Sequence, residues 1–242
     1  MSVEGTALVI GGSSGMGQGA ARALLARGVA VTVTSRTDAG VARAVAAFDD
    51  VAVVPGVEQR GRVEGVRCDL LDVDSVVAAV GSIGRIDRLV VSAAPARGGT
   101  NEEFFDGKFW GTKAAAFAAA ERMPEHGTMT VVSGGMAVRP PRGTWAVATA
   151  FAAVEALARA LAVEFAPRRV NCIRPGLFDT NTWSHMSTEE RTRFMADKTE
   201  PLPLGRAGTG QDFGAALVGI IGARYLTGQV IVLDGGVSLR AD

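Results

Sequence analysis

The amino-acid sequence predicts one doubly wound α/β domain, in which a parallel sheet carries helices on both faces. Short apolar runs rich in β-branched residues alternate along the chain with alanine-rich segments of helical periodicity. A glycine-rich turn joins the first such run to the first such segment. The length of 242 residues is ordinary for a single domain of this class, in which ligands bind at the C-terminal ends of the strands.

Composition excludes several classes of function. The chain has 25 basic and 25 acidic residues, so its charge favours neither nucleic acid nor an acidic surface. We expect no metal site, because His126 and His185 are the only histidines and lie far apart in sequence. Cys68 and Cys172 end predicted strands and are expected to be free thiols. No run looks long enough to span a membrane and no signal peptide is expected, so the predicted location is cytoplasmic.

The strongest local signal is a strand, a turn and a helix over residues 6–28. Residues 6–10 read as a buried strand, and apolar residues at helical spacing follow the turn as far as Gly28, a C-cap. A glycine turn at a helix N-terminus lets backbone N–H groups approach a phosphate closely, although a plain strand–helix turn would also collect glycines. The turn residues expected to bind a pyrophosphate are Gly11, Ser13, Ser14, Gly15, Met16 and Gly17.

The remaining elements are predicted from the same two periodicities. Further strands are expected at 30–34, 62–68, 86–91, 127–132, 169–174 and within 226–236. Helices are expected at 38–48, 72–83, 101–123 and 144–166. No function is predicted for the connection 49–61.

The spacing Gly11, Gly15, Gly17 resembles the TGxxxGxG turn of the short-chain dehydrogenase/reductase family, with Ile10 in place of the usual threonine. The resemblance extends over essentially the whole chain. It implies a Rossmann-type fold that binds a dinucleotide.

The end of the second strand favours NADP(H) over NAD(H). Ser35 stands where NAD-binding relatives have an acidic residue for the ribose 2′-hydroxyl, and Arg36 follows. A guanidinium can bind a 2′-phosphate through two hydrogen bonds. The alternatives are a solvated surface arginine and NAD binding assisted by Asp38.

The resemblance assigns further cofactor contacts. It implies that Asp69 and Leu70 contact the adenine, and that the cofactor passes Ser92, Ala93 and Ala94, where the family has Asn-Asn-Ala-Gly. The stretch from Pro175 to Thr180 resembles the family's Pro-Gly-x-x-x-Thr, which holds the carboxamide. The expected contacts in that stretch are Pro175, Gly176, Phe178 and Thr180.

Two catalytic residues are expected by the same resemblance. Ser133 matches the family's catalytic serine, and Lys108 occupies the position of its active-site asparagine. The alternatives are an ordinary turn serine and a lysine on a solvated helix face.

The family's Tyr-x-x-x-Lys is missing. Alignment places Val147 and Phe151 at the two positions, or Ala146 and Ala150 after a shift of one residue. The loss does not depend on the alignment, because the only tyrosine in the chain is Tyr225. Apolar side chains can neither donate a proton nor hydrogen-bond a ribose.

Residues 180–205 are expected to form a lid over the substrate. Aromatic and methionine side chains in this segment suggest an apolar substrate, and simple packing of the lid explains them equally well. Trp145, Arg139 and Trp183 are the candidate substrate residues.

Three functions follow as hypotheses. The first is an NADP(H)-dependent reductase with rebuilt proton delivery, acting on a small apolar carbonyl, quinone or imine-like substrate. The second is a non-redox cyclase, isomerase or lyase on this scaffold. The third is an NADP(H)-binding sensor or partner subunit. The family resemblance also implies a homodimer or homotetramer formed through helices 101–123 and 144–166.

Overall fold

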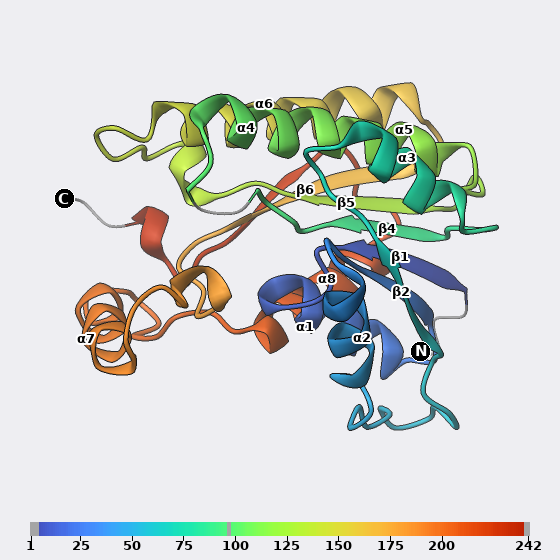
Figure 1. The fold of residues 1–242 in the computed structure, drawn as a ribbon, viewed down its shortest axis with the longest axis horizontal. Helices are drawn as coiled ribbons and strands as arrows, with labels where there is room; N and C mark the ends of the chain where they lie inside the picture. The colour runs from blue at the N-terminus through green and yellow to red at the C-terminus, as the bar shows by residue number, and fades with distance from the viewer. Residues whose placement is uncertain (1–4, 96–97, 240–242) are drawn as a thin grey trace.

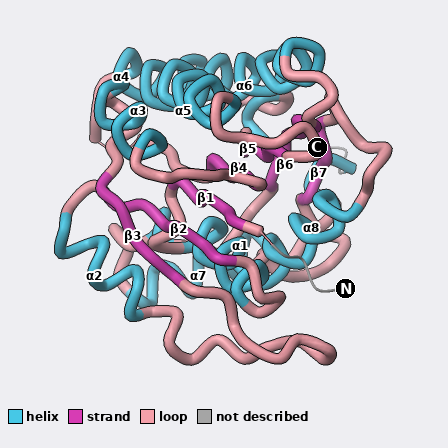
Figure 2. Tube along the Cα trace, turned by 90° about the vertical axis from the view of Figure 1, so that its right-hand side faces the viewer, coloured by secondary structure: helices cyan, strands magenta, loops and turns pink. Residues whose placement is uncertain are grey.

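The computed structural model describes residues 5–95 and 98–239, and its centre is a parallel sheet (Figure 1, Figure 2). Within these ranges the sheet has seven strands in the order β3-β2-β1-β4-β5-β6-β7. The chain reverses its direction of progress at β1, beside β4, which makes the sheet doubly wound. The strands are β1 (Thr6–Ile10), β2 (Ala30–Ser35), β3 (Val63–Arg67), β4 (Arg88–Val91), β5 (Thr128–Val132), β6 (Arg169–Pro175) and β7 (Val230–Leu233).

Helices cover both faces of the sheet, which confirms the predicted fold class (Figure 1). α3, α5 and α6 lie on one face, and α1, α2 and α8 lie on the other. The helices are α1 (Gly15–Leu25), α2 (Asp38–Ala46), α3 (Val73–Gly81), α4 (Asn101–Phe105), α5 (Thr112–Ala120), α6 (Trp145–Glu164), α7 (Thr188–Thr199) and α8 (Gly210–Gly222). Short helical turns η2 (Gly135–Ala137), η3 (Asn181–Trp183) and η4 (Val237–Leu239) complete the described elements.

The sequence predicts one continuous helix over 101–123. The structure instead has a π-helical segment, η1 (Asp106–Gly111), between α4 and α5. Glycines explain the close packing there. A Cβ on Gly107 would lie 2.6 Å from Pro95, and one on Gly111 would lie 2.4 Å from the carbonyl oxygen of Leu70. The widened turn carries the side chain of Lys108 into the interior.

Helix α6 contradicts the expectation that no run is long enough to cross a membrane. Its 20 residues meet that criterion by length and composition alone. One face of the helix packs in the core through Val154, Ala158 and Leu161. The opposite face leaves Trp145 and Val163 exposed at 65% and 81%.

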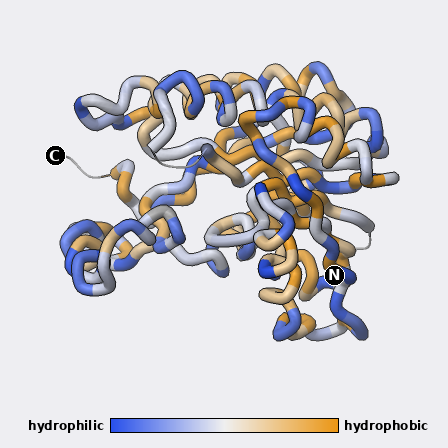
Figure 3. Tube along the Cα trace, viewed as in Figure 1, coloured by the Kyte–Doolittle hydropathy of each residue, from blue (hydrophilic) through white to orange (hydrophobic). Residues whose placement is uncertain are grey.

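The segment predicted as a lid contains η3 and α7. None of the residues of α7 is buried, and the helix stands away from the sheet and is largely hydrophilic (Figure 1, Figure 3). Arg191 on α7 forms an ion pair with Asp179, and its Nε lies 2.9 Å from the carboxylate.

Helices α1 and α8 touch through glycines. A Cβ on Gly19 would lie 1.8 Å from the carbonyl oxygen of Gly210, and one on Gly214 would lie 2.5 Å from that of Gly19. The N-terminus of α8 therefore rests directly against the first turn of α1, the turn that follows the glycine-rich loop.

The substitution Gly19→Ala is expected to destabilise the protein by about 2 kcal/mol or more, because the new methyl group meets backbone rather than a movable side chain. Gly219→Ala in α8 is the matched control, since nothing lies within 4 Å of the added Cβ. That variant should gain about 0.5–1 kcal/mol from helix propensity. Urea unfolding measures both, and equal stability of Gly19→Ala and wild type would contradict the packing.

Candidate active site

The glycine-rich turn, residues 11–17, forms a concave backbone surface, called the cradle below. Cβ atoms added to its glycines would lie too close to neighbouring atoms. A Cβ on Gly11 would lie 2.6 Å from the backbone nitrogen of Ala93, and one on Gly17 would lie 2.1 Å from the carbonyl oxygen of Gly11. Gly11 and Gly15 have φ angles of +85° and +55°, which other residues rarely adopt. The chain can therefore pass close to the end of β4 only because glycines stand at these positions.

Helix α1 begins directly after this turn, and its N-terminus fits a pyrophosphate. Ser14 is the N-cap residue, but its side chain makes no capping hydrogen bond. The first N–H groups of the helix are therefore left for a ligand, together with the partial positive charge of the helix end. The cradle and the helix end fit the diphosphate of a dinucleotide.

Other predicted cofactor residues are grouped at the C-terminal ends of the strands. Ser35 ends β2, and Arg36 follows it, exposed to solvent. Asp69 follows β3, where its carboxylate accepts a hydrogen bond from the backbone N–H of Leu71 at 3.1 Å. Leu70 is buried in the core, so its backbone rather than its side chain is left to contact a ligand.

The stretch after β6 lies next to the turn. Thr180 contacts the glycine turn, because a Cβ on Gly15 would lie 3.0 Å from the Cβ of Thr180. The side chain of Phe178 packs in the core against Phe213, with ring centroids 6.3 Å apart. Gly176 packs closely against Asp234, where a Cβ would lie 2.6 Å from that of the aspartate.

Lys108 is the most unusual group in this region. Its side chain lies on η1 and is 1% exposed, which excludes the alternative of a solvated lysine. The Nζ atom donates a hydrogen bond to the carbonyl oxygen of Ala93 at 2.9 Å. Among residues 5–95 and 98–239, no carboxylate forms an ion pair with Lys108. Burial lowers the pKa of this amine to about 8.

Phe151 lies where the family resemblance places a lysine, on helix α6. Its ring centroid lies 5.8 Å from Nζ of Lys108 and 5.7 Å from the ring centroid of Phe104. A Cβ on Gly134 would lie 2.5 Å from the Phe151 ring. The ring therefore depends on the glycine after Ser133, and it forms an apolar wall beside the buried amine.

Ser133 lies at the end of β5, but its hydroxyl faces the interior. The side chain is 3% exposed, and Oγ donates a hydrogen bond to Glu155 Oε1 at 2.9 Å. The Ser133 hydroxyl is therefore directed at Glu155 in this structure, and its contact with a substrate oxygen stays a prediction.

Glu155 and Arg174 were not recognised in the sequence as part of this region. Arg174 donates two hydrogen bonds to the Glu155 carboxylate, from Nε at 2.7 Å and from Nη2 at 2.6 Å. The pair ties α6 to the residue before Pro175, and removing one partner of such a buried pair costs about 3–5 kcal/mol. The sequence signal that could have revealed this ion pair was a glutamate in the middle of an alanine-rich helix.

Cys172 lies close to this network but offers no reactive thiol. Burial raises its pKa to about 11, and burial does the same for Cys68. Both cysteines are free and buried, as predicted.

The three predicted substrate residues lie on separate elements. Trp145 begins α6 and is largely exposed. Arg139 donates a hydrogen bond to the carbonyl oxygen of Val237 at 3.0 Å. Trp183 donates from Nε1 to the carbonyl oxygen of Phe178 at 2.9 Å and stacks on Phe194. Arg139 and Trp183 therefore already have hydrogen-bond partners within the protein. Their contact with a substrate stays a prediction.

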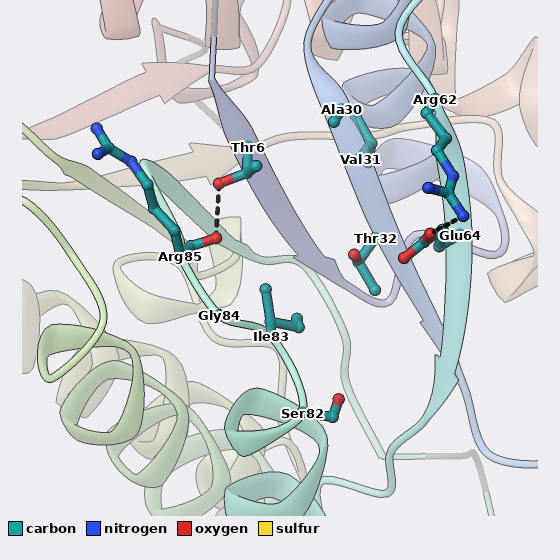
Figure 4. Close-up of a pocket in the computed structure, with 10 residues that line it drawn as sticks. All are labelled: Thr6, Ala30, Val31, Thr32, Arg62, Glu64, Ser82, Ile83, Gly84 and Arg85. Atoms are coloured by element: carbon teal, nitrogen blue, oxygen red, sulfur yellow. Dashed lines mark hydrogen bonds and ion pairs between the residues drawn. The ribbon is translucent and has the colours of Figure 1, made fainter.

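A hollow of about 290 Å³ lies at the opposite end of the strands (Figure 4). Thr6 Oγ1 donates to the carbonyl oxygen of Arg85 there at 2.6 Å, and Arg62 pairs with Glu64. This end of the sheet holds none of the residues predicted to bind the cofactor or substrate.

Comparison with known proteins agrees with this geometry. A family model described as enoyl-(acyl carrier protein) reductase matches residues 10–238. The short-chain reductase protein NovJ of Streptomyces niveus is 30% identical, over 98% of this chain and 95% of the relative. Dehydrogenase/reductase SDR family member 4 of Homo sapiens is 33% identical, over 97% and 87% of the two chains.

A solved small-chain dehydrogenase in complex with NADPH is similar in structure, with 28% identity and a TM-score of 0.78. The alignment covers 98% of this chain and 100% of that one. The chain therefore belongs to the short-chain dehydrogenase/reductase family, and its class is that of an oxidoreductase with a Rossmann-type fold.

The state of Lys108 can be tested through stability. Between pH values of about 8 and 10.5 the unfolded chain holds a proton that the folded amine has lost, so folding is favoured as pH rises through this window. Relative to Lys108→Met, wild type should gain about 2–3 kcal/mol between about pH 7 and about pH 10. Urea unfolding at the two pH values measures the gain. The control Lys198→Met, on an exposed residue, should show no such change.

A difference in unfolding free energy between wild type and Lys108→Met that stays constant across this pH range would contradict a buried Lys108 amine that loses its proton near pH 8.

Proposed function

We propose that this protein is an NADP(H)-dependent reductase that delivers its proton from Lys108 instead of a tyrosine. The observation that carries the proposal is the buried amine of Lys108, bonded to Ala93 beside the cradle for the cofactor. Buried residues with strongly shifted pKa values are frequently functional. Burial of a lysine without an ion-pair partner costs stability, and a role in the reaction would account for that cost.

Several observations support NADP(H) as the cofactor. The glycine cradle and the free N-terminus of α1 fit a diphosphate. Arg36 stands at the end of β2, where a 2′-phosphate would lie. The alignment with the solved relative in complex with NADPH covers 98% of this chain. Ser92, Ala93 and Ala94 would line the path between the two ends of the cofactor.

NADPH supplies the hydride in reactions of this class. The protein must then orient the acceptor and provide a proton. A lysine ammonium has three N–H donors, and the bond to Ala93 uses one of them. A donor with a pKa of about 8 is well matched to proton transfer near neutral pH. Lys108 would transfer the proton to the substrate oxygen or nitrogen directly or through one water.

The apolar wall beside Lys108 supports a substrate that is itself apolar. Phe151 and Phe104 pack edge to face next to the amine, and Val147 replaces the hydroxyl of a tyrosine. Hydride addition gives a neutral amine from an iminium and a stabilised anion from a quinone or a conjugated enone, so these acceptors need less help from an acid. We therefore propose a small apolar carbonyl, quinone or imine-like compound as the substrate.

A protein that binds NADP(H) without chemistry is the second candidate. Two observations favour it: Lys108 is nearly sealed from solvent, and Ser133 is turned toward Glu155. Tight cofactor binding without turnover on any acceptor would select this candidate.

We also propose a homodimer or homotetramer through the segments 101–123 and 144–166. The exposed face of α6 ends in Val163, and Phe117 on α5 is 41% exposed. Phe117 packs on Phe165 just after α6, with ring centroids 5.1 Å apart, so α5 meets the end of α6 at a partly exposed aromatic side chain.

The proposal predicts that Lys108→Met keeps NADPH binding but loses turnover. NADPH fluorescence should show binding within about threefold of wild type, because Lys108 faces Ala93 and not the pyrophosphate cradle. Turnover with carbonyl, quinone and imine acceptors should fall by about 10²–10⁴-fold. In wild type, turnover should decline as pH rises through about 8, where the ammonium is lost.

Lys113→Met is the matched control, since Lys113 lies one turn further on and packs on Phe117. It should keep both binding and turnover. Unchanged turnover in Lys108→Met would remove Lys108 from the reaction, and product formed without any nicotinamide would select the non-redox class.

A further inference from the structure

The two strands at the outer edge of the sheet end side by side. β3 is the edge strand and pairs with β2 in parallel register, with Ser35 opposite Arg67. The backbone N–H of Cys68 donates to the carbonyl oxygen of Ser35 at 2.9 Å, so the pairing continues to the last residue of each strand. Neighbouring strands lie about 4.8 Å apart. Arg67 is therefore beside the end of β2, one residue before Arg36.

Arg67 and Ser35 also share one face of the sheet. A Cβ on Gly65 would lie 2.4 Å from the side chain of Val41, so this position of β3 faces helix α2. Side chains two residues apart in a strand point to the same face, which places Arg67 on the α2 side. A Cβ on Gly40 would lie 2.2 Å from Ser35 Oγ, so Ser35 lies under the first turn of the same helix.

Arg36 and Arg67 are both exposed, and within the parts of the chain that the structure describes neither has a hydrogen-bond or ion-pair partner. The other arginine of this edge, Arg62, differs because it pairs with Glu64 at 2.6 Å. Two acidic side chains flank this corner in sequence: Asp38 in the first turn of α2, and Asp69, whose carboxylate accepts a hydrogen bond from the backbone N–H of Leu71. Among the described residues neither carboxylate pairs with Arg36 or Arg67, so both guanidinium groups are left to bind an anion.

This corner is where the second strand of a dinucleotide-binding fold meets the adenosine ribose. NADP(H) carries a phosphate monoester on that ribose, and NAD(H) does not. Guanidinium groups bind such a phosphate through charge-assisted hydrogen bonds from two directions. We propose that Arg67 binds the 2′-phosphate together with Arg36, and that the pair selects NADP(H) over NAD(H).

This inference rests on the proposed use of NADP(H), and one set of titrations tests the two separately. Wild type, Arg36→Met, Arg67→Met and Arg62→Met are each titrated with NADPH and NADH. Arg67→Met should weaken NADPH binding by about tenfold and leave NADH binding unchanged. Arg67→Lys should recover part of the loss, since a lysine keeps the charge but not the paired donors. Arg62→Met, at the other end of β3, should behave as wild type.

The outcomes are distinguishable. Failure of wild type to bind NADPH would overturn the proposed function itself. Binding by wild type that Arg36→Met weakens and Arg67→Met leaves unchanged would overturn the role of Arg67 alone. An equal loss of NADPH and NADH affinity in Arg67→Met would show a structural effect, and it would likewise overturn the inference.

Discussion

The close contact between Gly11 and Ala93 is the constraint on which the candidate site depends. At this contact the glycine-rich turn meets the end of β4, and a Cβ on Gly11 would lie 2.6 Å from the Ala93 backbone. Ala93 then accepts the hydrogen bond of Lys108 through its carbonyl oxygen. One residue of the central loop therefore touches the cofactor cradle on one side and the buried amine on the other. The two parts of the candidate site are therefore positioned by a single short segment of backbone.

The side chains around this segment depend on one another for their packing. Phe151 lies where the family resemblance places a lysine, and its ring requires the glycine at position 134. Lys108 brings an amine into the same region from a different helix. Glu155, the buried carboxylate of α6, is paired with Arg174 and does not face Lys108 as an ion-pair partner. The result is an apolar wall beside one buried amine, and the proposed substrate class rests on this arrangement.

Local patterns predicted the strands and the glycine turn, because each depends on residues near one another in sequence. The burial of Lys108 was harder to predict from the sequence. Residues 101–123 read as one helix, and the π segment arises from Gly107 and Gly111 approaching Pro95 and Leu70 from outside that stretch. The direction of the Ser133 hydroxyl depended on Glu155, on the next helix. Motif position identified these residues, but only packing between distant segments fixed where their side chains point.

The central claim is that Lys108 is a buried amine that titrates beside Ala93, in the segment proposed to line the cofactor. NMR of the protein with isotope-labelled lysine side chains, titrated with and without NADP⁺, tests it most directly, with Lys108→Met to assign the signal. We predict a lysine resonance that titrates with a pKa of about 8 and shifts when NADP⁺ binds. A Lys108 signal that titrates at the ordinary value of 10.5 and does not respond to the cofactor would contradict the account.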